Sequence, residues 1–346
     1  MKSVSEITNL VQEWVQEIGS KTPGFRGAYL FGGIAGLADE ALRPDYLDVD
    51  LIVVVTGKMR PQEENLELDY KGVLLEVGFW GTEDHSSAEA ILSNPALASN
   101  FAGTKILADP GNWLAPLQHT VKSEFPRRKW VAARCEAEKE RIHENVESIR
   151  LANSPDARGM ALWEWLNNLS GLLALASLRK PTHRRSLTLM KEILAQQGRL
   201  DLHEEALRIW GVGGMSRQRV QAVLDESLVL FDRALEIKRS PSMLDFKLRP
   251  HLRPYFCEAN QEMIDEGNHR EAMFWIIVGY SIAAQVVIND GGEDEKRSAA
   301  GNWAHLNEEM SPDGPEGWPR QLKAINELTG KILALADQMV AQNPND

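Results

Sequence analysis

Over the first 120 residues, one helical pattern is followed by a series of short apolar runs. Hydrophobic residues such as Ile7, Val11 and Trp14 recur three and four positions apart, which predicts an amphipathic helix over residues 4–18. Runs of apolar or alternating residues, bounded by glycine, proline and polar residues, then predict β-strands over 27–31, 48–55, 66–70, 73–80 and 105–108. This part of the chain is therefore expected to form a small mixed sheet with flanking helices.

The segments between these runs complete the expected domain. Lys71-Gly72 separates two alternating runs and predicts a hairpin. We also expect a helix over residues 34–42, and short helices over 86–101 that are broken at Pro95.

After about residue 120 the strand patterns fade and helical periodicity dominates. Helices are predicted over 128–150, 157–178, 184–197, 201–210, 216–239, 255–266, 269–288 and 317–342, and residues 289–300 are expected to form a polar loop. No fixed-period repeat is present in the sequence. The fold class expected is α+β, with a mixed-sheet domain over 1–120 and an all-α helical bundle over 121–346.

Composition changes this picture little and mainly excludes alternatives. The 346 residues are 43% hydrophobic and 25% charged, as in ordinary globular proteins. Two cysteines, Cys135 and Cys257, are too few for a disulfide framework and favour a reducing compartment. The N-terminus lacks a signal-peptide pattern, and the apolar stretch 275–288 is too short and too interrupted to span a bilayer. We therefore expect a cytoplasmic protein with no membrane partner.

Charge is spread unevenly along the chain. The formal net charge is −12, and residues 1–120 contain 8 lysines and arginines against 17 aspartates and glutamates. Nucleic-acid binding needs a basic face, so this balance argues against nucleic acid as a partner. It suits a divalent cation or a cationic substrate, although acidic charge also serves solubility alone.

The segment over residues 29–55 contains the best candidate chemistry. In a strand that opens with Asp48-Val49-Asp50, a period of two places both carboxylates on one face. Two carboxylates that point together repel each other unless a cation lies between them, and hard oxygen ligands suit magnesium. Gly32-Gly33, at the end of the preceding strand, offers backbone N–H groups to an anion. The alternative is a tight turn followed by a strand with solvated acids.

Glu76 is the best candidate for a third carboxylate. It interrupts an otherwise apolar run over residues 73–79. A carboxylate there is costly unless it has a cation or a role. The alternative is an edge-strand glutamate that faces water.

Taken together, these residues resemble the nucleotidyltransferase superfamily that includes DNA polymerase beta and the aminoglycoside nucleotidyltransferases. The family pattern is an apolar strand, a Gly-Gly pair, an Asp-x-Asp pair and a later acidic residue. This sequence has the same residue types in the same order, as Gly32-Gly33, Asp48-Val49-Asp50 and Glu76. The run KILADPGNWL at 105–114 is similar to the end of that domain in the antibiotic-modifying branch, where a helical domain follows.

The resemblance implies a function and a set of roles. Asp48 and Asp50 would hold Mg²⁺, and Gly32 and Gly33 would contact a nucleoside triphosphate, with ATP favoured. Glu76 would act as the base or as a further metal ligand. The reaction implied is transfer of a nucleoside monophosphate to a hydroxyl of a small, aminoglycoside-like acceptor, in a cleft between the domains. The sequence identifies neither the acceptor nor the oligomeric state.

Some residues depart from the family pattern and keep a second function open. Gly33 replaces a more usual serine, Leu47 stands where the branch usually has serine, and the long interval before Asp48 would allow Asp45 to enter the site. The alternative is a nucleotidyltransferase-like binding or regulatory protein with weak or no turnover, such as a toxin–antitoxin component.

Weaker patterns in the second half have mainly structural interpretations. Trp163-Glu164-Trp165 is capable of holding a cationic amine but is more typical of a helix core. The basic segment 180–186 would reach a triphosphate or form a solvated helix start. His143, His183 and His203 show no paired ligand spacing and are expected to be surface or capping residues.

Overall fold

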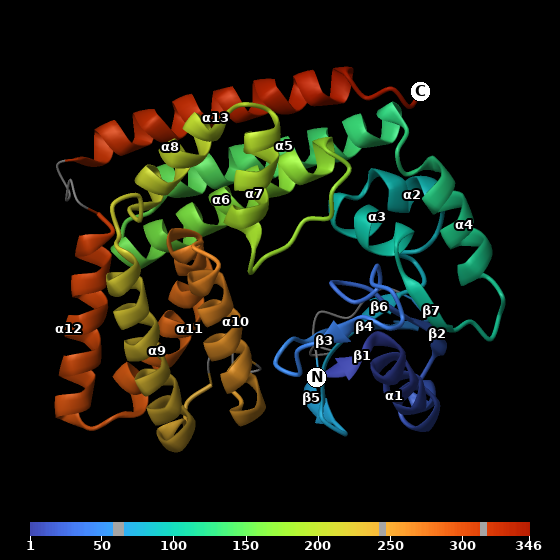
Figure 1. Ribbon diagram of the computed structural model, residues 1–346, viewed down its shortest axis with the longest axis horizontal. Helices are drawn as coiled ribbons and strands as arrows, with labels where there is room; N and C mark the ends of the chain where they lie inside the picture. Colours follow the sequence, from blue (N-terminus) through green and yellow to red (C-terminus); the bar gives the residue numbers. More distant parts are fainter. Residues whose placement is uncertain (58–65, 242–246, 312–316) are drawn as a thin grey trace. The chain divides into compact units, whose positions relative to one another are not determined.

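The computed structural model describes residues 1–57, 66–241, 247–311 and 317–346 (Figure 1). The chain has an α+β fold in two compact units, Met1–Arg134 with Asn345–Asp346 and Cys135–Pro344. The division falls inside helix α5 (Arg128–Leu151), whereas the sequence placed it at residue 120. The first turns of α5 belong to the sheet unit because the buried Arg134 side chain donates hydrogen bonds to the carbonyl oxygens of Leu92 and Phe125.

The sheet unit is organised around five strands in the order β5–β6–β4–β2–β7. Only β4 and β6 among them run parallel, and the other neighbours are antiparallel. The predicted strands are confirmed, as β2 (Phe25–Leu30), β4 (Val49–Val55), β5 (Leu66–Tyr70), β6 (Val73–Gly81) and β7 (Lys105–Ala108). A second, two-stranded sheet pairs β1 (Lys2–Ser3) with β3 (Leu42–Arg43).

Helices cover the two faces of this sheet unequally. Helix α1 (Val4–Glu17), capped by Ser3 and Glu6, packs its apolar side on the face that carries Val49, Leu51 and Val53. The opposite face carries Ile52 and Val54 and is covered by α2 (Ala88–Ser93), α3 (Pro95–Ala102) and α4 (Leu114–Glu124). The predicted helices over 4–18 and 86–101 are thus confirmed, and α4 was not predicted.

The predicted helix over residues 34–42 is wrong. The segment forms turns and then enters β3. Its carbonyl oxygens at Asp39 and Ala41 accept hydrogen bonds from the backbone N–H groups of Ser5 and Val4. A nine-residue helix is marginal by itself, so pairing with the start of the chain replaces it.

Over the residues that the structure describes, all regular elements of the second unit are helical. Its helices are the remainder of α5, α6 (Pro155–Ala176), α7 (Ser186–Gln196), α8 (Leu200–Trp210), α9 (Arg217–Ile237), α10 (Arg253–Asp265), α11 (His269–Asp290), α12 (Glu293–Glu309) and α13 (Trp318–Ala341). Short 3₁₀ turns occur at Gly19–Lys21 in the first unit and Pro250–Leu252 in the second. Helix α11 packs against α7, α9, α10 and α12, which places it at the centre of the bundle.

The expected polar loop over 289–300 is mostly helix α12. Only Ala299 and Leu306 of this helix are buried, so it has too few apolar positions for spacing to reveal it. Its start is fixed locally, because the Glu295 side chain accepts a hydrogen bond from the Gly292 N–H.

Helix α11 is the one helix of the described residues that is long and apolar enough to cross a membrane by length and composition. The residues of its most apolar window are 78% buried inside the unit, so it packs as a core helix. Cys135 and Cys257 are both thiols.

Candidate metal centre

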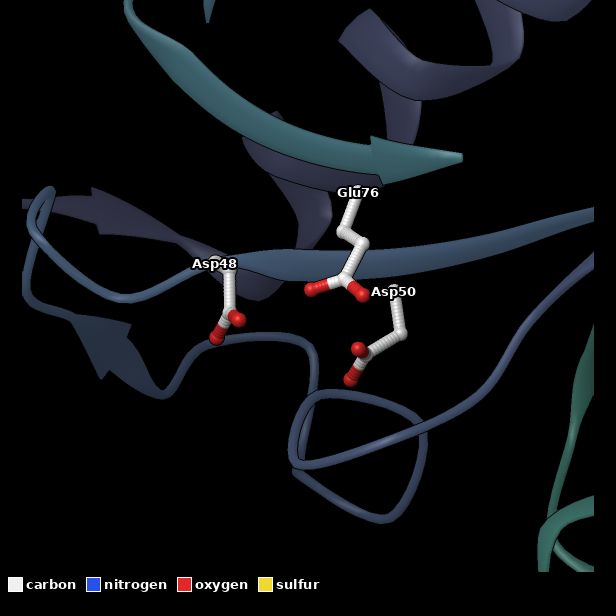
Figure 2. Close-up of side chains that lie close together, drawn as sticks. All are labelled: Asp48, Asp50 and Glu76. Atoms are coloured by element: carbon white, nitrogen blue, oxygen red, sulfur yellow. The ribbon is translucent and has the colours of Figure 1, made fainter. Parts of the chain in front are cut away.

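Two adjacent parallel strands bring the three predicted acidic residues together. In the register of β4 against β6, Asp50 lies beside Glu76. Asp48 immediately precedes β4 and, two residues from Asp50, projects to the same face. Figure 2 shows the three carboxyl groups turned toward a common volume, next to the loop that follows β2.

One carboxylate oxygen from each of Asp48, Asp50 and Glu76 lies within 4.8 Å of the other two. All three residues are half-buried. They lie on the face that carries Ile52 and Val54, at the end of β4 that precedes those residues. Like charges at this spacing repel each other, and a hard divalent cation with oxygen ligands removes the repulsion. The donor set therefore fits Mg²⁺ or Mn²⁺.

Gly32 is required at its position by the Asp50 side chain. Its backbone φ is +75°, a region that favours glycine, and a Cβ atom there would lie 1.5 Å from Asp50 Oδ2. Any side chain would therefore displace that carboxylate. The sequence assigned Gly32 to phosphate contact, which stays a prediction, and the structure adds this steric role.

Gly33 is in a different situation, although it is the next residue. It is exposed, and a Cβ atom there would lie 3.6 Å from Nη1 of Arg43, an ordinary contact distance. The space around Gly33 thus admits an alanine methyl group in the protein as it stands. The role of Gly33 in phosphate contact stays a prediction.

Asp45 does not join the three carboxylates. It binds the N-terminal ammonium of Met1 at 2.7 Å and Lys2 at 3.4 Å. The hydrogen bond from the ammonium lowers the pKa of the Asp45 carboxyl. Asp45 lies in the long interval between Gly33 and Asp48, and its ion pairs connect this loop to the first two residues of the chain.

Two charged residues near the acids were missed by sequence reasoning. Arg43 is 7% exposed, and its guanidinium donates a hydrogen bond to the backbone oxygen of Asp48. Glu67 on β5 lies directly opposite Glu76 in the antiparallel register and extends the acidic row to a third strand. The alternation of residues 66–70 places Glu67 on a polar face, but no local pattern distinguishes Arg43 from a surface arginine.

The other sequence patterns of the helical unit are structural. Trp163 stacks on Phe274 and donates a hydrogen bond to its backbone oxygen at 2.9 Å, and the buried Trp165 donates one to Thr329. In the basic segment 180–186, Arg184 and Arg185 bind residues of α10.

The surface prediction for three histidines is confirmed for two of them. His143 and His183 are exposed. His203 is fully buried and lies 3.0 Å from Glu271, so its prediction is wrong. The contact joins α8 to α11, two helices far apart in sequence, which local spacing does not reveal.

No family model and no curated protein matches the sequence. Among solved structures, the chain is similar to a nucleotidyltransferase-like protein from Exiguobacterium sibiricum 255-15, with 15% sequence identity and a TM-score of 0.32. The similarity covers 75% of this chain and 92% of that chain.

Proposed function

We propose that the chain is a Mg²⁺-dependent nucleotidyltransferase. It would transfer a nucleoside monophosphate from a nucleoside triphosphate, with ATP favoured, to a hydroxyl group of a small polar acceptor of the aminoglycoside type. The observation that carries this proposal is the meeting of Asp48, Asp50 and Glu76 within 4.8 Å beside the Gly32–Gly33 turn. The proposed site of action is the cytoplasm.

The residues have distinct tasks in this proposal. Asp48 and Asp50 hold the metal ion, which when bound neutralises negative charge on the triphosphate and its leaving group. Gly33 leaves its backbone open to a phosphate. The acceptor oxygen forms a bond to the α-phosphorus, and the bond from that phosphorus to the pyrophosphate oxygen breaks. Glu76 takes the hydroxyl proton, or else serves as a further metal ligand.

The acidic balance of the first 120 residues supports the choice of acceptor. With 17 acidic against 8 basic residues, this part of the chain attracts cationic small molecules and repels nucleic-acid backbones.

A screen of nucleoside triphosphates with Mg²⁺, which measures pyrophosphate release against a panel of hydroxyl acceptors, tests the proposal. We expect release that depends on both Mg²⁺ and an acceptor and that is lost in Asp48→Asn. Tight triphosphate binding without release for any acceptor would favour the alternative, a binding or regulatory protein.

A further inference from the structure

Arg43 lies in the loop that joins the glycine turn to the first carboxylate. It belongs to the two-residue strand β3, which pairs with β1. The neighbouring Ala41 carbonyl accepts a hydrogen bond from the N–H of Val4, at the start of α1. The backbone of Arg43 is thus held from outside the acidic cluster, on a part of the unit that packs against the sheet core.

The guanidinium group of Arg43 reaches both ends of this loop. Nη2 donates a hydrogen bond to the backbone oxygen of Asp48, and Nη1 lies 3.6 Å from the position of a Cβ atom at Gly33. An arginine side chain is well suited to this task because its planar group presents several donors in a fixed arrangement. A lysine offers one ammonium on a flexible stem and is unable to reproduce that arrangement.

The burial of Arg43 shows that this arrangement is specific. Its side chain is 7% exposed, and a buried cation is costly unless negative groups and hydrogen bonds surround it. The backbone oxygen of Asp48 accepts one such hydrogen bond. This hydrogen bond therefore holds the buried guanidinium group against the backbone of Asp48.

We propose that Arg43 is a positioning residue of the metal centre, which holds Asp48 in register with the Gly32–Gly33 turn. This inference rests on the proposed function. It assigns Arg43 no contact with substrate, because its effect passes through the backbone of Asp48 and through Gly33. The residue links the part of the site that would hold the metal to the part that would contact phosphate.

Positioning and charge predict opposite changes in metal affinity. If Arg43 acted only as a nearby positive charge, its removal would strengthen the binding of a divalent cation. If it positions Asp48, its removal weakens binding, and partners that orient metal ligands typically contribute about 10-fold to 100-fold in affinity.

The experiment is a titration of the full chain with Mn²⁺ alone, followed by calorimetry, for wild type, Arg43→Lys and Arg43→Gln. Arg26→Gln is the matched control, because Arg26 is exposed on β2 of the same unit. We expect weaker Mn²⁺ binding by about tenfold or more in both Arg43 variants and no change in the control, with the melting temperature measured on each protein. Unchanged or tighter binding in a folded Arg43→Lys overturns the inference.

The binding outcomes separate this inference from the proposed function. If wild type binds no Mn²⁺, both fail together. If wild type and Arg43→Lys bind Mn²⁺ equally well, this inference alone is overturned.

If the Arg43 variants do not fold, hydrogen–deuterium exchange on wild type replaces them. Slower exchange of residues 31–48 on addition of Mn²⁺ then supports the inference, and unchanged exchange over that segment contradicts it.

Discussion

Both units contain carboxylates that are partly or fully buried, but the charged groups next to these carboxylates differ between the two units. In the sheet unit, Asp48, Asp50 and Glu76 bring oxygens of like charge within 4.8 Å of one another. In the helical unit, the buried Glu271 lies 3.0 Å from both His203 and Lys191. Side chains of the same unit pair with Glu271, whereas the geometry of Asp48, Asp50 and Glu76 makes them a candidate set of cation ligands. This difference separates a candidate functional site from a structural network.

The largest expected effect is on turnover, from Asp50→Asn. The substitution keeps the shape of the side chain and removes one negative charge from the cluster. We expect the barrier to nucleotidyl transfer to rise by about 3–4 kcal/mol, as when an electrostatic stabiliser is removed, which is roughly a several-hundredfold loss of rate. The melting temperature of the same variant checks that it is folded. Turnover of Asp50→Asn at the wild-type rate would contradict a catalytic role for Asp50.

The substitution Glu271→Gln should lower stability rather than turnover. Removing the charge that binds His203 and Lys191 should lower the free energy of unfolding by about 2–3 kcal/mol. Glu204→Gln is the control, since Glu204 joins the same two helices through Arg270 but is exposed, and such pairs contribute about 0–1 kcal/mol. Denaturant unfolding measures both, and equal losses would contradict the structural role of Glu271.

The same network predicts a pH dependence. Burial opposes the ionisation of Glu271, but hydrogen bonds from His203 and Lys191 outweigh it and hold its pKa at about 2, below the ordinary 4.5. A lowered carboxyl pKa contributes stability above pH 4.5, and that stability is lost as the pH falls toward 2. The difference in unfolding free energy between wild type and Glu271→Gln should therefore shrink over this range. A constant difference would count against the lowered pKa.

A smaller effect is expected from Gly33→Ala. The new methyl group meets only an ordinary contact with Arg43 in the protein itself, so the melting temperature should hold. It should obstruct a phosphate and weaken triphosphate binding by about tenfold, or about 1.4 kcal/mol. Gly36→Ala is the control, because a Cβ atom at this exposed position of the same loop meets nothing within 4 Å. Equal triphosphate affinity in the two variants would remove Gly33 from the site.

The smallest expected effect is a pH dependence of stability caused by His85, a buried side chain of the sheet unit whose two ring nitrogens both have partners. His85 Nδ1 contacts the Gly81 carbonyl oxygen, Nε2 contacts the Tyr29 hydroxyl, and burial lowers the pKa of the imidazole below 6.5. The unfolded chain therefore takes up the proton first, and stability should decline as the pH falls below about 6.5. Histidine proton NMR, with His85→Gln to assign the resonance, checks this. A midpoint at or above pH 6.5 would contradict it.

Sequence was most informative where local pattern and tertiary structure agree. Period two was enough to place Asp48 and Asp50 on one face of their strand, and Glu76 stood out because it interrupts an apolar run. The position of Glu76 beside Asp50 follows from the parallel pairing of β4 with β6. The two residues of β3 have no pattern of their own, and their pairing with β1 depends on the start of the chain. Arg43, and the fit of Asp50 against Gly32, follow from that long-range folding and were therefore not predictable locally.

The central claim is that the three carboxylates hold a divalent cation that binds a triphosphate. Calorimetry tests it most directly, with ATP titrated into wild type and into Asp50→Asn in the presence of Mg²⁺. We predict that Mg²⁺ tightens ATP binding to wild type, and that Asp50→Asn loses this gain while it remains folded. Equal ATP affinity of wild type with Mg²⁺ and with a chelator would contradict the metal centre.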